Sequence, residues 1–365
     1  MKRLFWCPLL AVVPITAQTL SFTPLPLSAG SSPKSIHVAD FNGDHNPDIV
    51  VVNAGGINQN SVSVLLGDGR GGFSNPLSTP AGGLGSIALT IGDYNHDRKR
   101  DVALVNNITN NVSILLGNGD GTFRVSGYYA THHGPVAIAT GDFNRDGNFD
   151  LAVVNSSTAD VTILLGKPDG TFQTRPDVYV GGGPTGLAVG DFNGDRIPDL
   201  AVSNGSLGLE VILISLGNGD GTFRNGGSAP VGNEPYAVVV GDFNRDRKLD
   251  LAVANLAAGS VSVLLGNGDS TFHPAANYPT GTGPVGLKSG DFNKDGKLDL
   301  AVCANVSNAV MVFLGNGDGT FQTPLSFPPG GFCNSVARGD LNHDGKPDIV
   351  TANTDNVIVL LNASR

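Results

Sequence analysis

Three observations predict that this chain of 365 residues folds into an all-β, seven-bladed propeller of four-stranded blades. A nine-residue pattern, Asp-x-Asn-x-Asp-x-x-x-Asp, occurs seven times, with its first Asp at 40, 93, 142, 191, 242, 291 and 340. The copies begin 49 to 53 residues apart, a period that is typical of propellers. Short apolar runs and Gly-containing turns separate the copies, as expected for strands joined by tight turns.

One repeat shows how the predicted blade is built. An apolar run of four residues, Leu-Ala-Val-Val, follows the acidic loop at 151–154. Its length and its β-branched residues indicate a strand that is buried on both faces. The predicted strands of this blade are, in order, 136–140, 151–154, 161–165 and an outer strand that begins at Thr171.

Two aromatic series accompany the repeat and are predicted to pack between blades. The first follows a tight turn, Leu-Gly-Asn-Gly-Asp-Gly-Thr-Phe in its clearest copies, whose Gly and Asn residues supply the positive φ angles of a hairpin. Its members are Phe73, Phe123, Phe172, Phe223, Phe272 and Phe321. The second series follows the first Asp of each loop and comprises Phe41, Tyr94, Phe143, Phe192, Phe243 and Phe292, with Leu341 in the seventh copy.

The N-terminal segment is predicted to close the ring. The sequence ends just after the third strand of the seventh blade, so that this blade lacks an outer strand. Ser21-Phe22-Thr23-Pro24 resembles residues 320–324, which begin an outer strand in another repeat. Pairing this segment with the last blade would remove an open sheet edge.

The first 17 residues have the pattern of a secretory signal, with Lys2 and Arg3, an apolar stretch and a small-residue end. The apolar stretch is too short to span a bilayer, and no other stretch approaches a membrane span. We therefore expect a signal peptide over 1–17, a propeller over 18–365, and a secreted protein in an extracellular, periplasmic or cell-surface location. A buried or disordered N-terminal tail is the alternative.

Two cysteines remain outside that segment, Cys303 and Cys333. Their repeat positions place them in adjacent blades, on the face opposite the acidic loops. A disulfide in an exported protein and two separate buried thiols both fit this placement.

The formal charge of −10 comes mainly from the repeated loops, which hold 21 of the 32 acidic residues. Seven bound divalent cations would add 14 positive charges and remove the excess of negative charge. The longest run of Lys and Arg along the chain is the three residues at 98–100, and the lack of a larger cluster argues against a nucleic-acid partner.

Each loop offers four oxygen-bearing side chains, and a backbone carbonyl at its seventh position can add a fifth ligand. Such oxygen-only ligation suits Ca²⁺, whereas Zn²⁺ prefers His or Cys. A set of Asx turns that cap strands is the alternative, and seven complete copies argue against it. The predicted ligands of up to seven Ca²⁺ ions are Asp40, Asn42, Asp44, Asp48, Asp93, Asn95, Asp97, Asp101, Asp142, Asn144, Asp146, Asp150, Asp191, Asn193, Asp195, Asp199, Asp242, Asn244, Asp246, Asp250, Asp291, Asn293, Asp295, Asp299, Asp340, Asn342, Asp344 and Asp348.

The sixth loop position distinguishes the copies. Three loops carry Gly there, as a sharp turn favours, and the others carry His45, Arg98, Arg196 and Arg247. Those four loops either bind the cation more weakly or avoid a positive φ. The side chains of His45, His96 and His343 are expected to point outward into solvent.

The loops and their spacing resemble the FG-GAP/VCBS-type repeat proteins, whose blades are similar to those of the integrin α-subunit propeller. The resemblance covers residues 19–362. It implies that each loop binds Ca²⁺ between the first and second strands of its blade. It implies no particular partner or activity, because one fold hosts many functions.

The sequence favours a non-enzymatic protein. No nucleophile elbow, zinc-protease motif or phosphate-binding loop occurs, and the only Glu residues are Glu210 and Glu234. His132-His133 lies in a connector opposite the acidic loops and is either an exposed polar turn or a local acid–base or transition-metal spot. We therefore expect a calcium-binding adhesion or binding scaffold, monomeric, with an unknown protein or glycan ligand on the hairpins between the second and third strands.

A carbohydrate-binding lectin is the main alternative, and a sugar lyase-type enzyme is a weaker one. Fungal seven-bladed lectins resemble this repeat and bind sugar between blades, commonly on aromatic platforms. The only Trp, Trp6, lies in the predicted signal. Tyr128, Tyr129, Tyr179 and Tyr278 lie on or near outer strands and either bind sugar or pack at blade edges.

Overall fold

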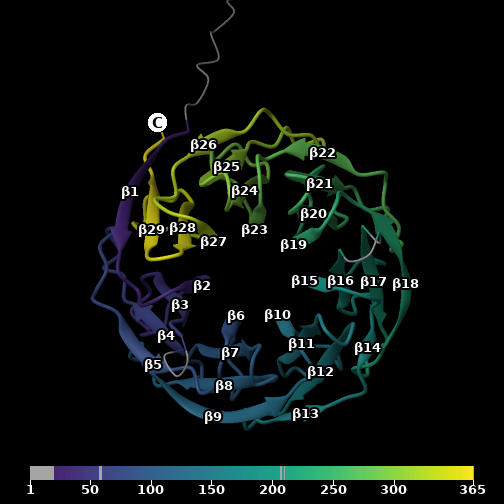
Figure 1. The fold of residues 1–365 in the computed structure, drawn as a ribbon, viewed down its shortest axis with the longest axis horizontal. Helices are drawn as coiled ribbons and strands as arrows, with labels where there is room; N and C mark the ends of the chain where they lie inside the picture. Colours follow the sequence, from purple (N-terminus) through teal and green to yellow (C-terminus); the bar gives the residue numbers. More distant parts are fainter. Residues whose placement is uncertain (1–19, 57–59, 206–207, 209, 365) are drawn as a thin grey trace, which may run out of the picture.

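The computed structural model describes residues 20–56, 60–205, 208 and 210–364. Within them, seven antiparallel sheets surround a common axis as the blades of a propeller (Figure 1). The predicted signal peptide lies outside the described residues. No helix in the described part of the chain is long and apolar enough to cross a membrane.

Each blade begins with a strand beside the central axis. Most of these strands start at Pro and end directly before the first Asp of a loop. They are β2 (Pro33–Ala39), β6 (Ser86–Gly92), β10 (Pro135–Gly141), β15 (Pro184–Gly190), β19 (Pro235–Gly241), β23 (Pro284–Gly290) and β27 (Cys333–Gly339).

The second strand of every blade begins at the last Asp of the loop. The four residues after this Asp are apolar or small, and the strand is almost entirely buried because it lies in the middle of its sheet and between neighbouring blades. These strands are β3 (Asp48–Ala54), β7 (Asp101–Asn106), β11 (Asp150–Asn155), β16 (Asp199–Asn204), β20 (Asp250–Asn255), β24 (Asp299–Ala304) and β28 (Asp348–Asn353).

The third strands pair with the second and complete the buried layer. They are β4 (Asn60–Leu65), β8 (Asn111–Gly117), β12 (Asp160–Gly166), β17 (Val211–Gly217), β21 (Ser260–Leu264), β25 (Ala309–Phe313) and β29 (Val357–Asn362). The hairpins that precede them lie on the face opposite the acidic loops.

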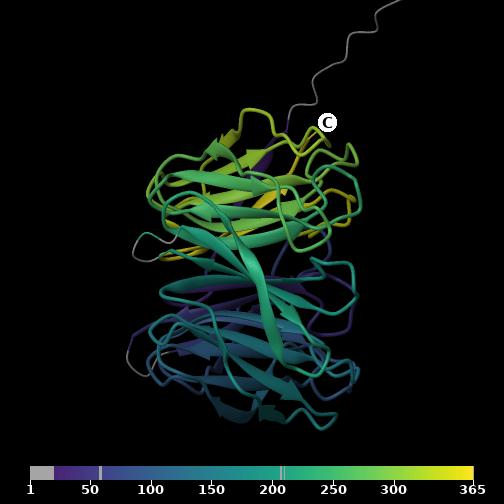
Figure 2. The ribbon, with the colours of Figure 1, turned by 90° about the vertical axis from the view of Figure 1, so that its right-hand side faces the viewer.

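The outer strands run between the two faces at the rim of the ring (Figure 2). They are β5 (Leu77–Pro80), β9 (Phe123–Ala130), β18 (Phe223–Pro230), β22 (Ala276–Pro279) and β26 (Leu325–Phe327). In blade 3 the outer strand is split into β13 (Phe172–Thr174) and β14 (Val178–Tyr179), which both pair with β12.

The N-terminal strand closes the ring, as predicted. Strand β1 (Phe22–Leu27) pairs antiparallel with β29 and becomes the outer strand of blade 7 (Figure 1). The ring of Phe22 also packs edge-on against Phe327 of blade 6, with 4.9 Å between ring centroids. The first segment of the propeller thereby covers the sheet edge that the last strand would otherwise expose.

The two aromatic series do pack between blades. An aromatic residue that follows the first Asp of one loop meets the post-turn Phe of the next blade edge-on, as Phe41 does with Phe123 at 5.7 Å and Phe143 with Phe223 at 5.5 Å. Between blades 7 and 1, Leu341 takes the place of the aromatic residue and shares an apolar cluster with Phe73. This repeated contact gives neighbouring blades a common core.

A disulfide joins blades 6 and 7. Cys303 near the end of β24 and Cys333 at the start of β27 are bonded, with their Cα atoms 5.7 Å apart. Both cysteines are buried on the side away from the acidic loops. Of the two sequence-based alternatives, the disulfide is therefore the one that the structure contains, and it is typical of proteins in an oxidising compartment.

Candidate functional site

The seven acidic loops lie on one face of the ring, each between the first and second strands of a blade. Within every loop, backbone N–H groups point at the side-chain oxygens of the repeated pattern. The first-position Asp accepts from the sixth residue at 2.8–3.0 Å. The third-position Asn accepts from the fifth residue, and the fifth-position Asp accepts from the seventh. These hydrogen bonds between backbone N–H groups and nearby side-chain oxygens hold the loop in its conformation.

The ninth-position Asp has a different environment and is fully buried in every loop. One of its oxygens accepts from the backbone N–H of the second loop residue at 2.7–2.9 Å. The other accepts from a backbone N–H at the end of the third strand, which belongs to Gly in six blades and to Asn362 in the seventh. This carboxylate therefore ties the loop to its own sheet.

Burial raises the pKa of this buried carboxyl to about 6 in six loops, those of Asp48, Asp101, Asp150, Asp199, Asp299 and Asp348. The pKa of Asp250 is also raised, again chiefly by burial. The two backbone donors oppose the rise, and the charges of neighbouring loop carboxylates add to it. A negative charge at this position is thus electrostatically costly unless a cation lies beside it.

The donor set fits a hard divalent cation. Every loop supplies only oxygen ligands, and no His or Cys belongs to the set. In the seventh loop, Oδ1 of Asp340 is buried and has no hydrogen-bond partner among the described residues. A bound cation would satisfy that oxygen and would offset the repulsion between the carboxylates.

The sixth loop residue adopts a positive φ whether or not it is Gly. His45, Arg98, Arg196 and Arg247 have φ between 64° and 68°, while Gly147, Gly296 and Gly345 have φ between 79° and 85°. The expectation that the four bulky residues would avoid a positive φ is therefore wrong. Their backbone must turn sharply because the N–H at this position donates to the first-position Asp.

Nδ1 of His45 lies 3.9 Å from Oδ2 of Asp40 in its own loop, and the other two loop histidines connect neighbouring loops. The His45 side chain is 97% exposed. Nε2 of His96 lies 2.8 Å from Oδ1 of Asn148 in the next loop, and Nε2 of His343 lies 3.0 Å from Oδ1 of Asn46 across the closure. The prediction that these two histidines face solvent alone was therefore incomplete, because each bridges to the following blade.

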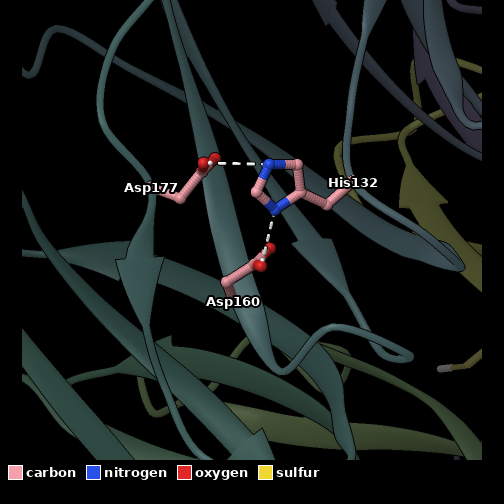
Figure 3. A group of neighbouring side chains, drawn as sticks. All are labelled: His132, Asp160 and Asp177. Atoms are coloured by element: carbon pink, nitrogen blue, oxygen red, sulfur yellow. Dashed lines mark hydrogen bonds and ion pairs between the residues drawn. The ribbon is translucent and has the colours of Figure 1, made fainter.

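His132 is not a simple exposed turn residue. Its two ring nitrogens face two carboxylates, with Nδ1 2.7 Å from Asp160 and Nε2 3.2 Å from Asp177 (Figure 3). The hydrogen bond to Asp160 is the main cause that raises the pKa of His132, which favours an imidazolium. The cluster fastens the connector before β10 to β12 and to the segment that splits the outer strand of blade 3. His133 has no comparable partner among the described residues.

A pocket of about 590 Å³ lies beside this cluster, between blades 3 and 4. Its walls come from β14 and the residues around it, and from β17 and β18. Val178, Leu213 and Phe223 supply apolar surface, and Asp177 and Arg224 supply charge. Sequence reasoning missed this pocket because it depends on the split outer strand.

The four tyrosines considered as sugar platforms behave differently. Tyr129 and Tyr278 pack edge-on against phenylalanine rings, so that edge packing accounts for both. Tyr128 is 54% exposed on β9, and Tyr179 is 79% exposed on β14. Of the four, only Tyr179 lines the interblade pocket.

The fold also gathers basic residues that are scattered in the sequence. Lys34, His37, Lys288 and Arg338 line cavities along the central axis. The sequence-based prediction concerned a nucleic-acid surface and did not anticipate these residues, which the inner strands of blades 6, 7 and 1 bring together at the axis. Alignment of the repeats would have revealed them, since the other inner strands carry uncharged residues at the corresponding positions.

The fold and its ring of acidic loops define a repeat-built, seven-bladed β-propeller with a candidate cation site in every blade. The pattern of the FG-GAP-like repeat matches residues 40–104, 93–153, 142–202, 242–302 and 291–351, and the chain belongs to this family. These matches together include all seven loops. No curated protein sequence matches the chain significantly.

Solved structures share the fold at low sequence identity. The BBS1N chain crystallised in complex with ARL6DN has a TM-score of 0.67 and 12% identity, over 93% of this chain and 95% of that one. An Agrocybe aegerita lectin that recognises non-reducing terminal N-acetylglucosamine has a TM-score of 0.56 and 19% identity, over 92% and 87%. An inactive virginiamycin B lyase from Staphylococcus aureus has a TM-score of 0.62 and 14% identity, over 93% and 99%. At these identities the likeness concerns the fold alone.

Proposed function

We propose that this protein is a secreted, calcium-stabilised propeller that acts as a non-enzymatic binding or adhesion scaffold. The observation that carries the proposal is the buried ninth-position Asp, which is present in all seven loops and held by two backbone donors. A nearby positive charge would offset the cost of ionising such a carboxylate, and the first, third and fifth positions of the same loop carry further oxygen side chains. Bound Ca²⁺ would supply that charge.

Calcium at these loops would act on the whole ring and not only on single blades. The backbone carbonyl of the second loop residue accepts from the turn of the next blade, as Phe41 does from Gly121 at 3.2 Å and Phe143 from Gly221 at 3.0 Å. The adjoining aromatic pair crosses the same boundary. Ordering the loop therefore orders the contact between two blades, which suits a rigid platform.

The opposite face supports a role in binding. Ile108 and Val306 lie on hairpins between second and third strands and are 65% and 62% exposed. Tyr236 and Phe332, at or just before the start of an inner strand, are exposed on the same side. Large apolar residues exposed on one face favour contact with a protein or glycan ligand. The hairpins at 54–60 and 205–209 belong to this face, and residues 57–59, 206, 207 and 209 lie outside the described residues.

Thermal unfolding with and without calcium tests the proposal. EDTA should lower the melting temperature, and added Ca²⁺ should restore it more effectively than Mg²⁺ at the same concentration. Each site contributes about 2.7 kcal/mol when the free ion is one hundred times its Kd. A melting temperature that changes neither with EDTA nor with added Ca²⁺ would remove calcium from the proposal.

The binding role needs its own measurement. The calcium-loaded protein would be screened against arrays of extracellular proteins and of glycans, beside a variant that carries Ile108→Ser and Val306→Ser. The variant should lose binding while its melting temperature stays unchanged, because both side chains are exposed. Binding that survives both substitutions would place the ligand elsewhere.

A carbohydrate-binding role is the second candidate, and the interblade pocket favours it. Tyr179 offers an exposed ring at a pocket that also contains Asp177 and Arg224. Sugars bind such combinations of an aromatic surface with a few directed polar groups. Tyr179→Ala should abolish signals on a glycan array, and Tyr128→Ala, which removes an exposed tyrosine outside the pocket, should not. An array without signals for the intact protein would refute this candidate.

A further inference from the structure

The central axis of the propeller contains a positively charged channel. One cavity, of about 570 Å³, is lined by His37, Lys288 and Arg338 together with small and apolar residues. A second cavity, of about 230 Å³, reaches toward the face opposite the acidic loops and includes Lys34. His37 and Lys288 line both cavities, which are therefore parts of one channel.

No negative side chain offsets these charges. The residues that line the two cavities include no Asp and no Glu. Among the ion pairs of the described residues, none involves Lys288 or Arg338. A protein with 32 acidic and 22 basic residues thus keeps two unpaired cations inside its axis. Arg338 is exposed to the channel and Lys288 is half-buried. A half-buried ammonium without a counter-ion is unfavourable for folding, so Lys288 would gain from an anion in the channel.

The repeats provide an internal comparison that separates fold from function. The position three residues before the first loop Asp holds His37 in blade 1 and Lys288 in blade 6. The other blades hold Thr90, Ala139, Ala188, Val239 and Ala337 there. The next position holds Arg338 in blade 7 and uncharged residues in the other six. The blade architecture therefore forms without charge at these positions.

The basic residues come from three consecutive blades. Strand β27 of blade 7 contacts β23 of blade 6 on one side and β2 of blade 1 on the other, across the ring closure (Figure 1). The groups also affect one another: burial and then the charge of Lys288 lower the pKa of His37 to about 3, and burial and then the charge of Arg338 lower the pKa of Lys288. The positive potential is thus concentrated on one side of the channel.

We propose that this side of the channel binds an oxyanion, such as the sulfate, phosphate or carboxylate group of a small molecule, between Lys288 and Arg338 and beside His37. The guanidinium of Arg338 can donate two parallel hydrogen bonds to such a group, and Lys288 adds a compact charge. Neutral His37 can donate one ring N–H. The inner strands also have one edge without a neighbouring strand, which leaves backbone N–H groups available at the channel.

Titration calorimetry on the calcium-loaded protein tests this inference, with sulfate, methyl phosphate and succinate as probes. The variant carries Lys288→Ala and Arg338→Thr, which gives blades 6 and 7 the residues that blade 3 holds at the same positions, Ala139 and Thr140. The control carries Lys167→Ala and Arg124→Thr, which remove the same charge from the exposed exterior. We expect at least one probe to bind the intact protein and the control alike, and the channel variant about tenfold more weakly or not at all.

Thermal unfolding gives a second readout that does not depend on heat of binding. Sulfate stabilises most proteins by exclusion from their surface, so the informative quantity is the difference between variants. At equal ionic strength, replacing chloride by sulfate should raise the melting temperature of the intact protein and the control more than that of the channel variant. Because the variant removes mutual repulsion, it should remain folded.

Two results would overturn the inference: equal affinity of the intact protein and the channel variant for every probe, or no binding of any probe by the intact protein. Preference for succinate over sulfate and methyl phosphate would identify the group as a carboxylate, and the reverse would identify a tetrahedral oxyanion. The inference goes beyond the scaffold role and does not depend on it. The calcium response is measured in a separate experiment, so that a failure of the calcium proposal and a failure of oxyanion binding can be told apart.

Discussion

Oδ1 of Asp48 accepts a hydrogen bond from the backbone N–H of Gly67 at 2.8 Å, which joins the start of the second strand to the end of the third. In blade 1 this position is restricted to Gly, because a Cβ on residue 67 would collide with the carbonyl oxygen of Pro47. The same pairing recurs in all seven blades. In blade 7, Asn362 provides the backbone donor, and its side-chain amide donates to the carbonyl of Phe292 at 2.8 Å. At other blade boundaries the equivalent loop carbonyl accepts from a turn of the next blade, as Phe41 does from Gly121. The Asn362 side chain replaces that donor, because the outer strand of blade 7 comes from the N-terminus and not from such a turn.

Asp48→Asn should therefore destabilise the protein by about 2 kcal/mol, even without calcium. The amide can accept from only one of the two backbone donors, so that the other is left buried without a partner. Chemical denaturation would measure the loss. Asp355→Asn makes the same charge change on an exposed hairpin and should leave the free energy of unfolding nearly unchanged. Equal effects of the two substitutions would contradict this account of Asp48.

The sixth loop position should make the calcium sites unequal. Gly147→Ala tests the backbone alone, because φ is 85° and a Cβ would meet nothing within 4 Å. We expect a loss of about 1 kcal/mol in stability, since an L-residue resists this conformation.

Calcium titration of the unmodified protein should resolve a tighter class from the Gly-containing loops and a weaker class from the loops with His45, Arg98, Arg196 and Arg247. Seven identical sites would show that the strain has no effect on binding.

The N-terminal strand should be essential for the ring. Deletion of residues 18–30 removes β1, exposes the edge of β29 and leaves Phe327 without the ring of Phe22. The truncated protein should melt at a markedly lower temperature and should associate through the open edge. A chain that begins at residue 18 is the matched control and should behave as the full propeller. Light scattering would detect association, and a truncated protein that melts like the control would disprove the role of β1 in closure.

The fold could be predicted from the sequence because the residues of each repeat indicate the loop and the strands of one blade. Four oxygen side chains at fixed spacing determine the loop, the apolar runs determine the strands, and Ser21–Pro24 repeats the beginning of an outer strand. The channel and the His132 cluster could not be predicted in the same way. Lys288 and His37 are about 250 residues apart in sequence and meet only because the ring closes between their blades. Asp177 lies where the outer strand of blade 3 is interrupted, and no repeat pattern places a carboxylate there opposite His132.

The disulfide should contribute strongly to stability. Cys303 and Cys333 are separated by 30 residues, and closing a loop of that length in the unfolded chain corresponds to about 3–4 kcal/mol. Replacing both cysteines by Ser should lower the free energy of unfolding by roughly that amount. A reducing agent should lower the melting temperature of the intact protein and leave the double variant unaffected. Sensitivity of the double variant to the reductant would point to an effect other than loss of this bond.

His132 should make stability depend on pH around blade 3. The folded protein raises the pKa of His132 above its ordinary value, mainly through the hydrogen bond to Asp160. Protons therefore bind the folded state more tightly than the unfolded chain. The stabilisation is fully present below the ordinary pKa of about 6.5 and is lost as the pH rises through the raised folded pKa. Solvent weakens the effect, because the His132 side chain is 50% exposed.

His132→Gln should reduce stability most at mildly acidic pH, and the difference from the intact protein should shrink as the pH rises. Denaturant titrations at a series of pH values would measure that difference. His133→Gln, in which the neighbouring residue is replaced, should show no such trend because His133 does not pair with these carboxylates. A difference between the intact protein and His132→Gln that stays constant across this pH range would mean that His132 stabilises blade 3 by packing alone, without its charge.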